Sequence, residues 1–148
     1  RNFDALWEEY SGPSHPSSDH YKGEAVGCTP ETKALIELTN KYPFKRTVSY
    51  HAMGEVIYWY FGQTGALRDE TELFAKKFAD MTGYPTDKNY ENLDPAGYKD
   101  WAISKKGIPS LTIEVGTGGN PVNPSQFDRI YKENKDAFGL LLSEVFGS

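Results

Sequence analysis

The sequence predicts an α/β domain, because stretches with helical spacing alternate with stretches of strand composition. Residues 46–61 are rich in Val, Ile, Tyr, Trp and Phe, and residues 110–115 alternate apolar with polar side chains. Both patterns are typical of strands. Apolar residues recur at helical intervals between and after these stretches. A chain of 148 residues is expected to form one domain.

The first third of the chain predicts a loop, a helix and the start of a sheet. Residues 1–28 show no sustained period and hold several Gly, Pro and Ser, so a long loop is expected. Thr29 and Pro30 are suited to the N-cap and first position of a helix that runs to about Asn40. Two strand segments should follow, on either side of a bend at Gly54.

Two helices are predicted in the middle of the chain. Asp69 and Glu72 have the spacing of a capping box, and the helix that they open should end at Gly83, a residue suited to a C-cap. Residues 83–95 then have loop composition. A short helix around Trp101 is expected to stop before Pro109.

The last third predicts one strand and one long helix. Glu114 falls at the end of the strand over residues 110–115, next to a glycine-rich turn. A helix opens at Asn123 and should break near Asn134. Its apolar residues are expected to pack on the sheet: Phe127, Ile130, Tyr131, Phe138, Leu141, Leu142 and Val145.

Composition excludes several classes of protein. The net charge of −5 would repel a phosphate backbone, so nucleic acid is not an expected partner. The longest apolar stretch, residues 56–61, is far shorter than the roughly 20 residues that cross a bilayer, so no membrane span is expected. Cys28 is the single cysteine and cannot form an internal disulfide. The first residue is Arg1, so we expect any signal or preceding domain to have been removed or never included.

A few residues stand out as candidates for chemistry. His51 follows a strand, but a lone histidine is more often structural than a metal ligand; His15 and His20 lie in the first loop and could join it. An acidic residue that closes an apolar strand, as Glu114 does, is costly unless it pairs, ligates or catalyses, although an exposed strand-end glutamate is an equal alternative. Arg1 could clamp a carboxylate with two hydrogen bonds, yet a solvated arginine is the commoner case.

Five blocks, in order, carry a resemblance to a known family. They are RNFD at 1–4, YKG and TPET within 21–32, SYH at 49–51, GYKDW at 97–101 and GIPSLTIEVG at 107–116. Together they resemble the second half of the M14 zinc carboxypeptidases, especially their bacterial γ-D-glutamyl-(L)-meso-diaminopimelate endopeptidase branch. The resemblance implies a zinc-carboxypeptidase-like mixed sheet with flanking helices.

The resemblance also implies roles for individual residues. His51 would be a ligand of Zn²⁺, and Glu114 would be the base that takes a proton from water. Arg1, helped by Asn2, would hold a carboxylate of the peptide substrate, which could be a cell-wall stem peptide. Lys99 would favour an additional anionic group, such as the second carboxylate of diaminopimelate. Tyr90 is the nearest candidate for the family's mobile tyrosine.

The same resemblance leaves part of the site unaccounted for. The family's His-x-x-Glu pair, which supplies two zinc ligands, would precede Arg1. Residues 1–148 are therefore expected to be the C-terminal part of the catalytic domain and to be inactive alone. Their expected partner is the missing N-terminal half. A cell-envelope or secreted location is favoured over the cytoplasm. The alternatives are a non-catalytic module that binds peptides or cell wall through a degenerate peptidase fold, and an unrelated aromatic-rich binding module.

Overall fold

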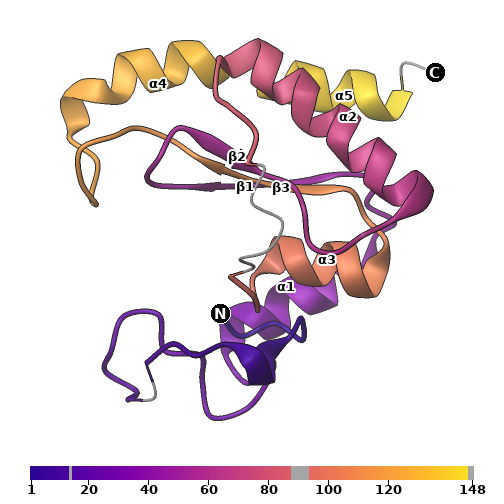
Figure 1. Ribbon diagram of the computed structural model, residues 1–148, viewed down its shortest axis with the longest axis vertical. Coiled ribbons are helices and arrows are strands. Elements are labelled where there is room, and N and C mark those ends of the chain that lie inside the picture. Colours follow the sequence, from indigo (N-terminus) through magenta and orange to yellow (C-terminus); the bar gives the residue numbers. More distant parts are fainter. Residues whose placement is uncertain (14, 88–93, 147–148) are drawn as a thin grey trace.

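A small mixed sheet lies at the centre of the structure (Figure 1). The computed structural model describes residues 1–13, 15–87 and 94–146. Strands β1 (Thr47–His51), β2 (Val56–Tyr58) and β3 (Ser110–Glu114) form the sheet in the order β1-β3-β2. β1 runs parallel to β3, and β2 runs antiparallel to it. The predicted strands, and the bend at Gly54 between the first two, are therefore confirmed.

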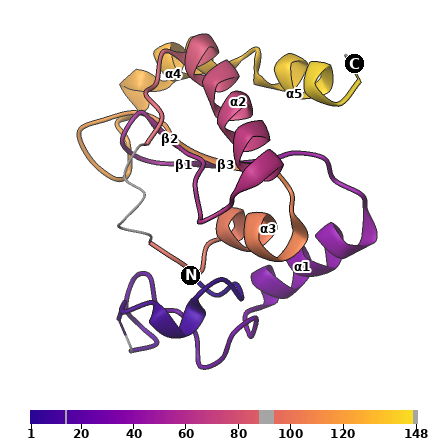
Figure 2. The same cartoon turned by 45° about the vertical axis from the view of Figure 1, so that its right-hand side comes forward.

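Helices cover both faces of the sheet. α2 (Gly65–Thr82), α4 (Phe127–Asn134) and α5 (Ala137–Phe146) lie on one face, and α1 (Pro30–Lys41) and α3 (Tyr98–Lys106) lie on the other (Figures 1 and 2). Among the described residues, no helix is both long and apolar enough to pass through a bilayer.

Each face of the sheet has its own buried cluster. On the α2 side, fully buried side chains from β2, β3 and the residue after β2 meet side chains from the helix: Ile57, Trp59, Phe74, Phe78, Leu111 and Ile113. On the α3 side, a second cluster contains Phe3, Phe61, Trp101, Ala102 and Ile103. Buried clusters thus lie on both sides of the sheet, and they hold the ends of its strands in fixed positions.

α1 begins and ends close to the predicted limits. The Thr29 hydroxyl accepts a hydrogen bond from the Thr32 amide at 3.3 Å, as an N-cap should. The described residues before it form a loop, apart from a short 3-10 helix at Trp7–Glu9. α3 likewise occupies its predicted place and ends at Gly107, which has a left-handed backbone.

The predicted start of α2 is wrong. The helix begins at Gly65 rather than at Asp69, although it ends before Gly83 as expected. Residues 66–68 are good helix formers, and Leu67 packs against the cluster on the α3 side. The capping-box spacing at Asp69 therefore lies inside the helix, because tertiary packing extends the helix by one turn.

The C-terminal helix breaks near Asn134 as predicted, into α4 and α5. The expectation that all its apolar residues pack on the sheet is wrong, since Phe127, Tyr131 and Phe138 are 66%, 60% and 72% exposed. Apolar residues surround much of this helical stretch, and only one side of a helix can face the core. Ala137 and Leu141 occupy that inner side.

We predict that Phe78→Ala costs about 3–5 kcal/mol of unfolding free energy. The Phe78 ring is fully buried and meets Phe74 edge-to-face at 5.3 Å, so truncation leaves a cavity between α2 and the sheet. Leu73→Ala is the matched control, since this residue of the same helix is 54% exposed and should change stability by less than about 0.5 kcal/mol. Urea unfolding measures both, and equal effects would contradict the assignment of Phe78 to the core.

Candidate active site

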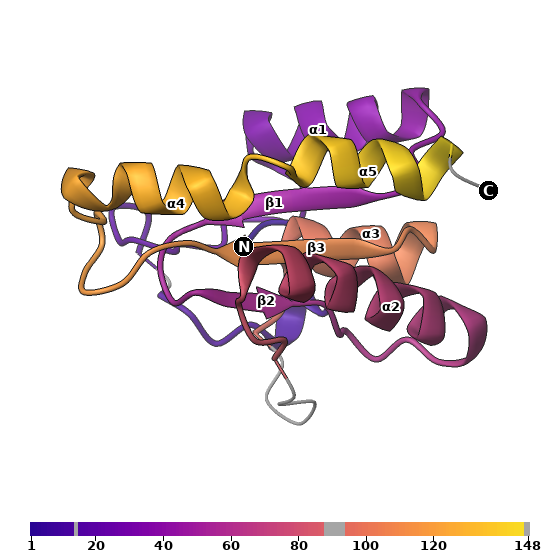
Figure 3. The same cartoon turned by 90° about the horizontal axis from the view of Figure 1, so that it is seen from above.

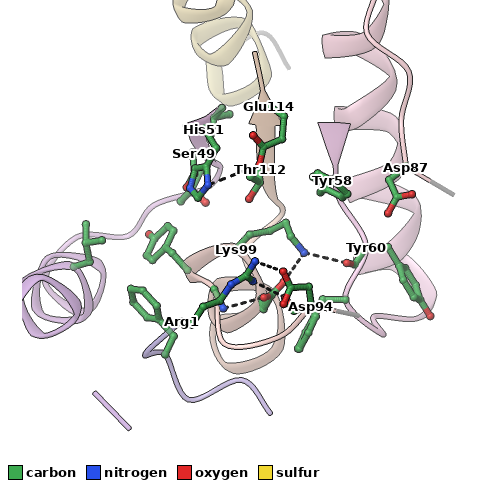
Figure 4. A pocket seen from close by; sticks show the side chains of 18 of the residues that line it. Arg1, Ser49, His51, Tyr58, Tyr60, Asp87, Asp94, Lys99, Thr112 and Glu114 are labelled. Atoms are coloured by element: carbon green, nitrogen blue, oxygen red, sulfur yellow. Dashed lines mark hydrogen bonds and ion pairs between the residues drawn. The ribbon is translucent and has the colours of Figure 1, made fainter. Parts of the chain in front are cut away.

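The structure brings His51 and Glu114 together. They are register partners at the ends of the parallel strands β1 and β3, so both side chains emerge at the same edge of the sheet. The His51 Nδ1 and Glu114 Oε1 atoms lie 3.9 Å apart (Figure 4). Their numbers in the sequence differ by 63, and the parallel pairing alone makes them neighbours.

Glu114 is the more enclosed of the two. Its side chain is 17% exposed, and its Oε2 atom is buried with no hydrogen-bond partner among the described residues. Burial raises the pKa of this carboxyl group, while the charges of His51 and Arg1 act in the opposite direction. A desolvated carboxylate with a free oxygen has the properties of a general base.

His51 is open to solvent and to ligands. Its side chain is 61% exposed, and its backbone carbonyl accepts a hydrogen bond from Val115 at 2.9 Å, which fixes the backbone. Within the described residues, no group of three or more His, Cys, Asp and Glu side chains could hold a metal ion. The exposed imidazole, beside a carboxylate oxygen of Glu114 that has no hydrogen-bond partner among the described residues, fits one ligand position of a zinc site, whose remaining protein ligands would come from elsewhere.

A large pocket opens beside this pair. Its volume is about 980 Å³. Figure 4 shows that His51 and Glu114 lie at one end, with Arg1, Asp94 and Lys99 toward the other. The pocket thus contains charges of both signs, and it can receive a polar or zwitterionic ligand.

Arg1 lines the pocket and is held by Asp94. One guanidinium nitrogen donates to the Asp94 backbone carbonyl at 2.7 Å, and the other pairs with the Asp94 carboxylate. The guanidinium carbon also lies 5.7 Å from the centre of the Tyr10 ring. A carboxylate is therefore already bound where the predicted substrate carboxylate would bind.

Asn2 does not line the pocket. It is buried, and its amide nitrogen donates to the carbonyls of Lys22 and Ala25 at 2.6 and 2.8 Å, while its oxygen accepts from Thr29 at 3.0 Å. These contacts tie the first loop to the start of α1. A role for Asn2 in substrate binding stays a prediction, and its contacts favour an indirect role through the position of Arg1.

Lys99 lies in the pocket but is only 8% exposed. Its ammonium group donates to the Tyr60 carbonyl at 3.0 Å and forms an ion pair with Asp100. Part of its charge is therefore already neutralised, and its predicted preference for an anionic group is untested. Tyr90, the predicted mobile tyrosine, lies outside the described residues.

Sequence reasoning did not identify Asp94 and Tyr58 as pocket residues. Burial raises the pKa of the Tyr58 hydroxyl, and the carboxylates of Asp87, Glu114 and Asp94 add to this effect. No sequence motif links Asp94 to Arg1 across 93 residues. His20 lines the pocket and the His15 ring bonds to Ser17 at 2.8 Å, but among the described residues neither histidine joins His51 in a group of three or more possible metal ligands.

A family model described as "Zinc carboxypeptidase" (Peptidase M14) matches residues 1–137. The chain belongs to this M14 family. It is 34% identical over 146 residues to "Gamma-D-glutamyl-L-diamino acid endopeptidase 1" of Lysinibacillus sphaericus, covering 97% of the chain and 35% of that protein. It is also 33% identical over 149 residues to the uncharacterized protein YqgT of Bacillus subtilis (strain 168), covering 99% of the chain and 38% of that protein.

Solved structures confirm the M14 fold. Carboxypeptidase A from Helicoverpa armigera superposes with a TM-score of 0.80 at 15% identity, over 100% of this chain and 41% of that one. Thrombin activatable fibrinolysis inhibitor superposes with a TM-score of 0.76 at 23% identity, over 97% of this chain and 40% of that one. This M14 chain thus spans well under half the length of these proteins.

A polar cluster lies behind the site, between α2 and α4. The Tyr84 hydroxyl donates to Glu133 at 2.6 Å, and the Asn134 amide nitrogen lies 3.4 Å from the same hydroxyl. Tyr84 is 4% exposed, and burial together with the neighbouring carboxylate raises its pKa to about 12.

We predict that Tyr84→Phe changes the alkaline stability of the protein. The ordinary pKa of 10.0 applies to the unfolded chain, so between pH 10 and about 12 the unfolded phenol loses its proton while the folded phenol keeps it. Tyr84 therefore contributes full stability below pH 10 and loses it as pH rises toward 12. Tyr84→Phe should be less stable at pH 7, by about 1.5–3 kcal/mol for a hydrogen bond to a charged group, with a shallower alkaline decline.

Urea titrations at pH 7, 9 and 11 measure this difference. Tyr21→Phe serves as a control for the loss of a phenol in a loop outside the cluster. A Tyr84→Phe curve parallel to that of the unmodified protein across this pH range would contradict the prediction.

Proposed function

We propose that residues 1–148 are the C-terminal part of an M14 catalytic domain that hydrolyses peptides with zinc as cofactor. The observation that carries the proposal is the pairing of an exposed His51 imidazole with the desolvated Glu114 carboxylate at one edge of the sheet, 3.9 Å apart. The two curated relatives match this chain over only 35% and 38% of their lengths, so the other zinc ligands are proposed to come from a preceding segment.

In the proposed mechanism, each residue of this chain has one task. His51 would hold the metal through a neutral imidazole. When bound, the zinc ion supplies Lewis acidity, which lowers the pKa of water and polarises the scissile carbonyl. Glu114 accepts a proton from the attacking water and returns it to the leaving amine, so one carboxyl group acts first as base and then as acid. Its burial limits competition from bulk water for that proton.

The substrate is proposed to be a peptide with a free carboxylate. Arg1 would release Asp94 and bind the substrate carboxylate in its place, which fixes the register of the peptide against Glu114. The endopeptidase of Lysinibacillus sphaericus carries γ-D-glutamyl-L-diamino acid in its name, which supports a cell-wall stem peptide as substrate. Lys99 would contact an additional anionic group of that peptide. A stem-peptide substrate would also imply a cell-envelope or secreted location.

Zinc content and peptidase activity test the central proposal. We expect a form extended upstream to the length of the relatives to bind one zinc ion and to cleave γ-D-glutamyl peptides, while residues 1–148 alone do neither. In the extended form, Glu114→Gln should keep the metal and lose activity, and His51→Ala should lose the metal. Glu37→Gln and His15→Ala, which alter exposed residues, are the matched controls.

An extended protein that folds but neither binds zinc nor cleaves γ-D-glutamyl peptides would contradict the peptidase proposal. Binding of stem peptides by that protein, in the absence of zinc, would instead support a non-catalytic binding module with the same fold.

We further predict that Arg1→Met raises KM by about 10- to 100-fold, with a smaller change in kcat, because a charge-assisted contact contributes about 1.5–3 kcal/mol. Steady-state kinetics on a substrate pair with a free and an amidated terminal carboxylate measures the effect. The unmodified protein should prefer the free carboxylate, and Arg1→Met should abolish that preference. Arg68→Met, at an exposed position of α2, is the control. A preference that survives in Arg1→Met would assign the carboxylate to another group.

A further inference from the structure

Two loops touch each other directly behind the candidate site. Residues 52–55 follow His51, and residues 115–119 follow Glu114. The Val115 amide donates to the His51 carbonyl, and the Gly54 amide donates to the Gly116 carbonyl, both at 2.9 Å. A displacement of either loop would therefore change the position of His51 relative to Glu114.

Two residues of these loops have unusual backbone conformations, and the first, Gly116, has no room for a side chain. A Cβ atom on Gly116 would lie 2.7 Å from Val122, and the φ of Gly116 is +69°. Glu55 also has a left-handed backbone, with φ of 52°, although it is not glycine. A non-glycine residue persists in this conformation where its surroundings hold it in place.

Arg129 of α4 holds Glu55 of the first loop directly and reaches the second loop through Gln126 (Figure 3 shows α4 above the end of the sheet where β1 and β3 finish). Its Nη1 atom lies 2.6 Å from Glu55 Oε1. Its Nη2 atom donates to Gln126 Oε1 at 2.8 Å. Gln126 in turn binds the backbone of Thr117 on both sides, accepting from its amide at 3.2 Å and donating to its carbonyl at 2.8 Å.

A second carboxylate keeps Arg129 in this orientation. Glu133 accepts from Arg129 at 3.0 Å and from the Tyr84 hydroxyl at 2.6 Å. The side chains of Glu55 and Glu133 are 27% and 23% exposed, and that of Arg129 is 44% exposed. Solvent screens such partly enclosed ion pairs less than exposed ones, so the contacts constrain the loops.

We propose that Arg129 is a positioning residue of the peptidase site. It holds the loop behind His51 against the loop behind Glu114 and so sets the separation of the imidazole and the carboxylate. Among the described residues, the polar partners of Arg129 are Glu55, Gln126 and Glu133, none of which lines the pocket. The inference rests on the proposed function, because the geometry that it preserves is useful only if the two groups act together.

The test compares Arg129→Met with Lys132→Met in the extended, zinc-loaded protein. Both changes remove a positive charge from α4, but Lys132 is exposed and has no part in the contacts that join Arg129 to Glu55 and, through Gln126, to Thr117. Arg129→Met should lower kcat by about 10- to 100-fold with KM changed by less than about twofold, because small displacements of catalytic groups affect the transition state most. It should also weaken zinc binding by about tenfold, measured by competition with a chelator.

Further variants separate positioning from a contribution to stability alone. Arg129→Lys should restore part of kcat, since an ammonium group can pair with Glu55 but cannot bridge to Gln126 with the same geometry. Glu55→Gln should lower kcat in the same way, and Glu55→Gln combined with Arg129→Met should be no worse than Arg129→Met alone. If Arg129→Met does not fold, Glu55→Gln and Gln126→Ala take its place.

The possible results are distinct. Values of kcat and zinc affinity for Arg129→Met that equal those of Lys132→Met, or additive losses in the double variant, would overturn the positioning role. Lack of zinc binding and activity in the unmodified extended protein would instead overturn the proposed function on which the inference rests.

Discussion

The parallel pairing of β1 with β3 is the constraint on which the candidate site depends. It matches His51 with Glu114 in register, so the two side chains share one face at the ends of their strands. A shift of either strand by one residue would turn its side chain to the opposite face and separate the pair. The buried clusters on both faces of the sheet prevent such a shift, because moving β3 would expose Leu111 and Ile113.

The desolvated carboxyl group of Glu114, at the end of β3, lowers the stability of the fold. Ile113 is fully buried, whereas the next residue, Glu114, has a buried oxygen with no partner among the described residues and a pKa raised by desolvation. An unsatisfied buried polar group costs free energy, which the neighbouring apolar core offsets. This contrast within one strand is typical of functional positions, where local stability is lower so that a reactive group stays available.

Local patterns predicted most elements, and contacts between distant residues were not predictable from them. The alternation over residues 110–115 and the Thr29 cap are properties of short segments, and both predictions are confirmed. The pairing of Arg1 with Asp94 joins residues far apart in the chain. The ion pair of Arg129 with Glu55 likewise depends on how α4 packs. The spacing of Arg129 and Glu133 on one face of α4, in contrast, is visible in the local sequence.

The proposed domain arrangement links two further features of the structure. β1 is an edge strand of the described sheet, and the pocket beside it continues onto Leu35 and Leu38, which are 40% and 45% exposed. An open strand edge next to apolar side chains favours association with another segment. A preceding segment that paired with β1 would cover this surface and would also lie within reach of His51, the last residue of that strand. One interaction would then both complete the sheet and add ligands to the metal site, so we expect folding of the extended protein and its zinc binding to be coupled.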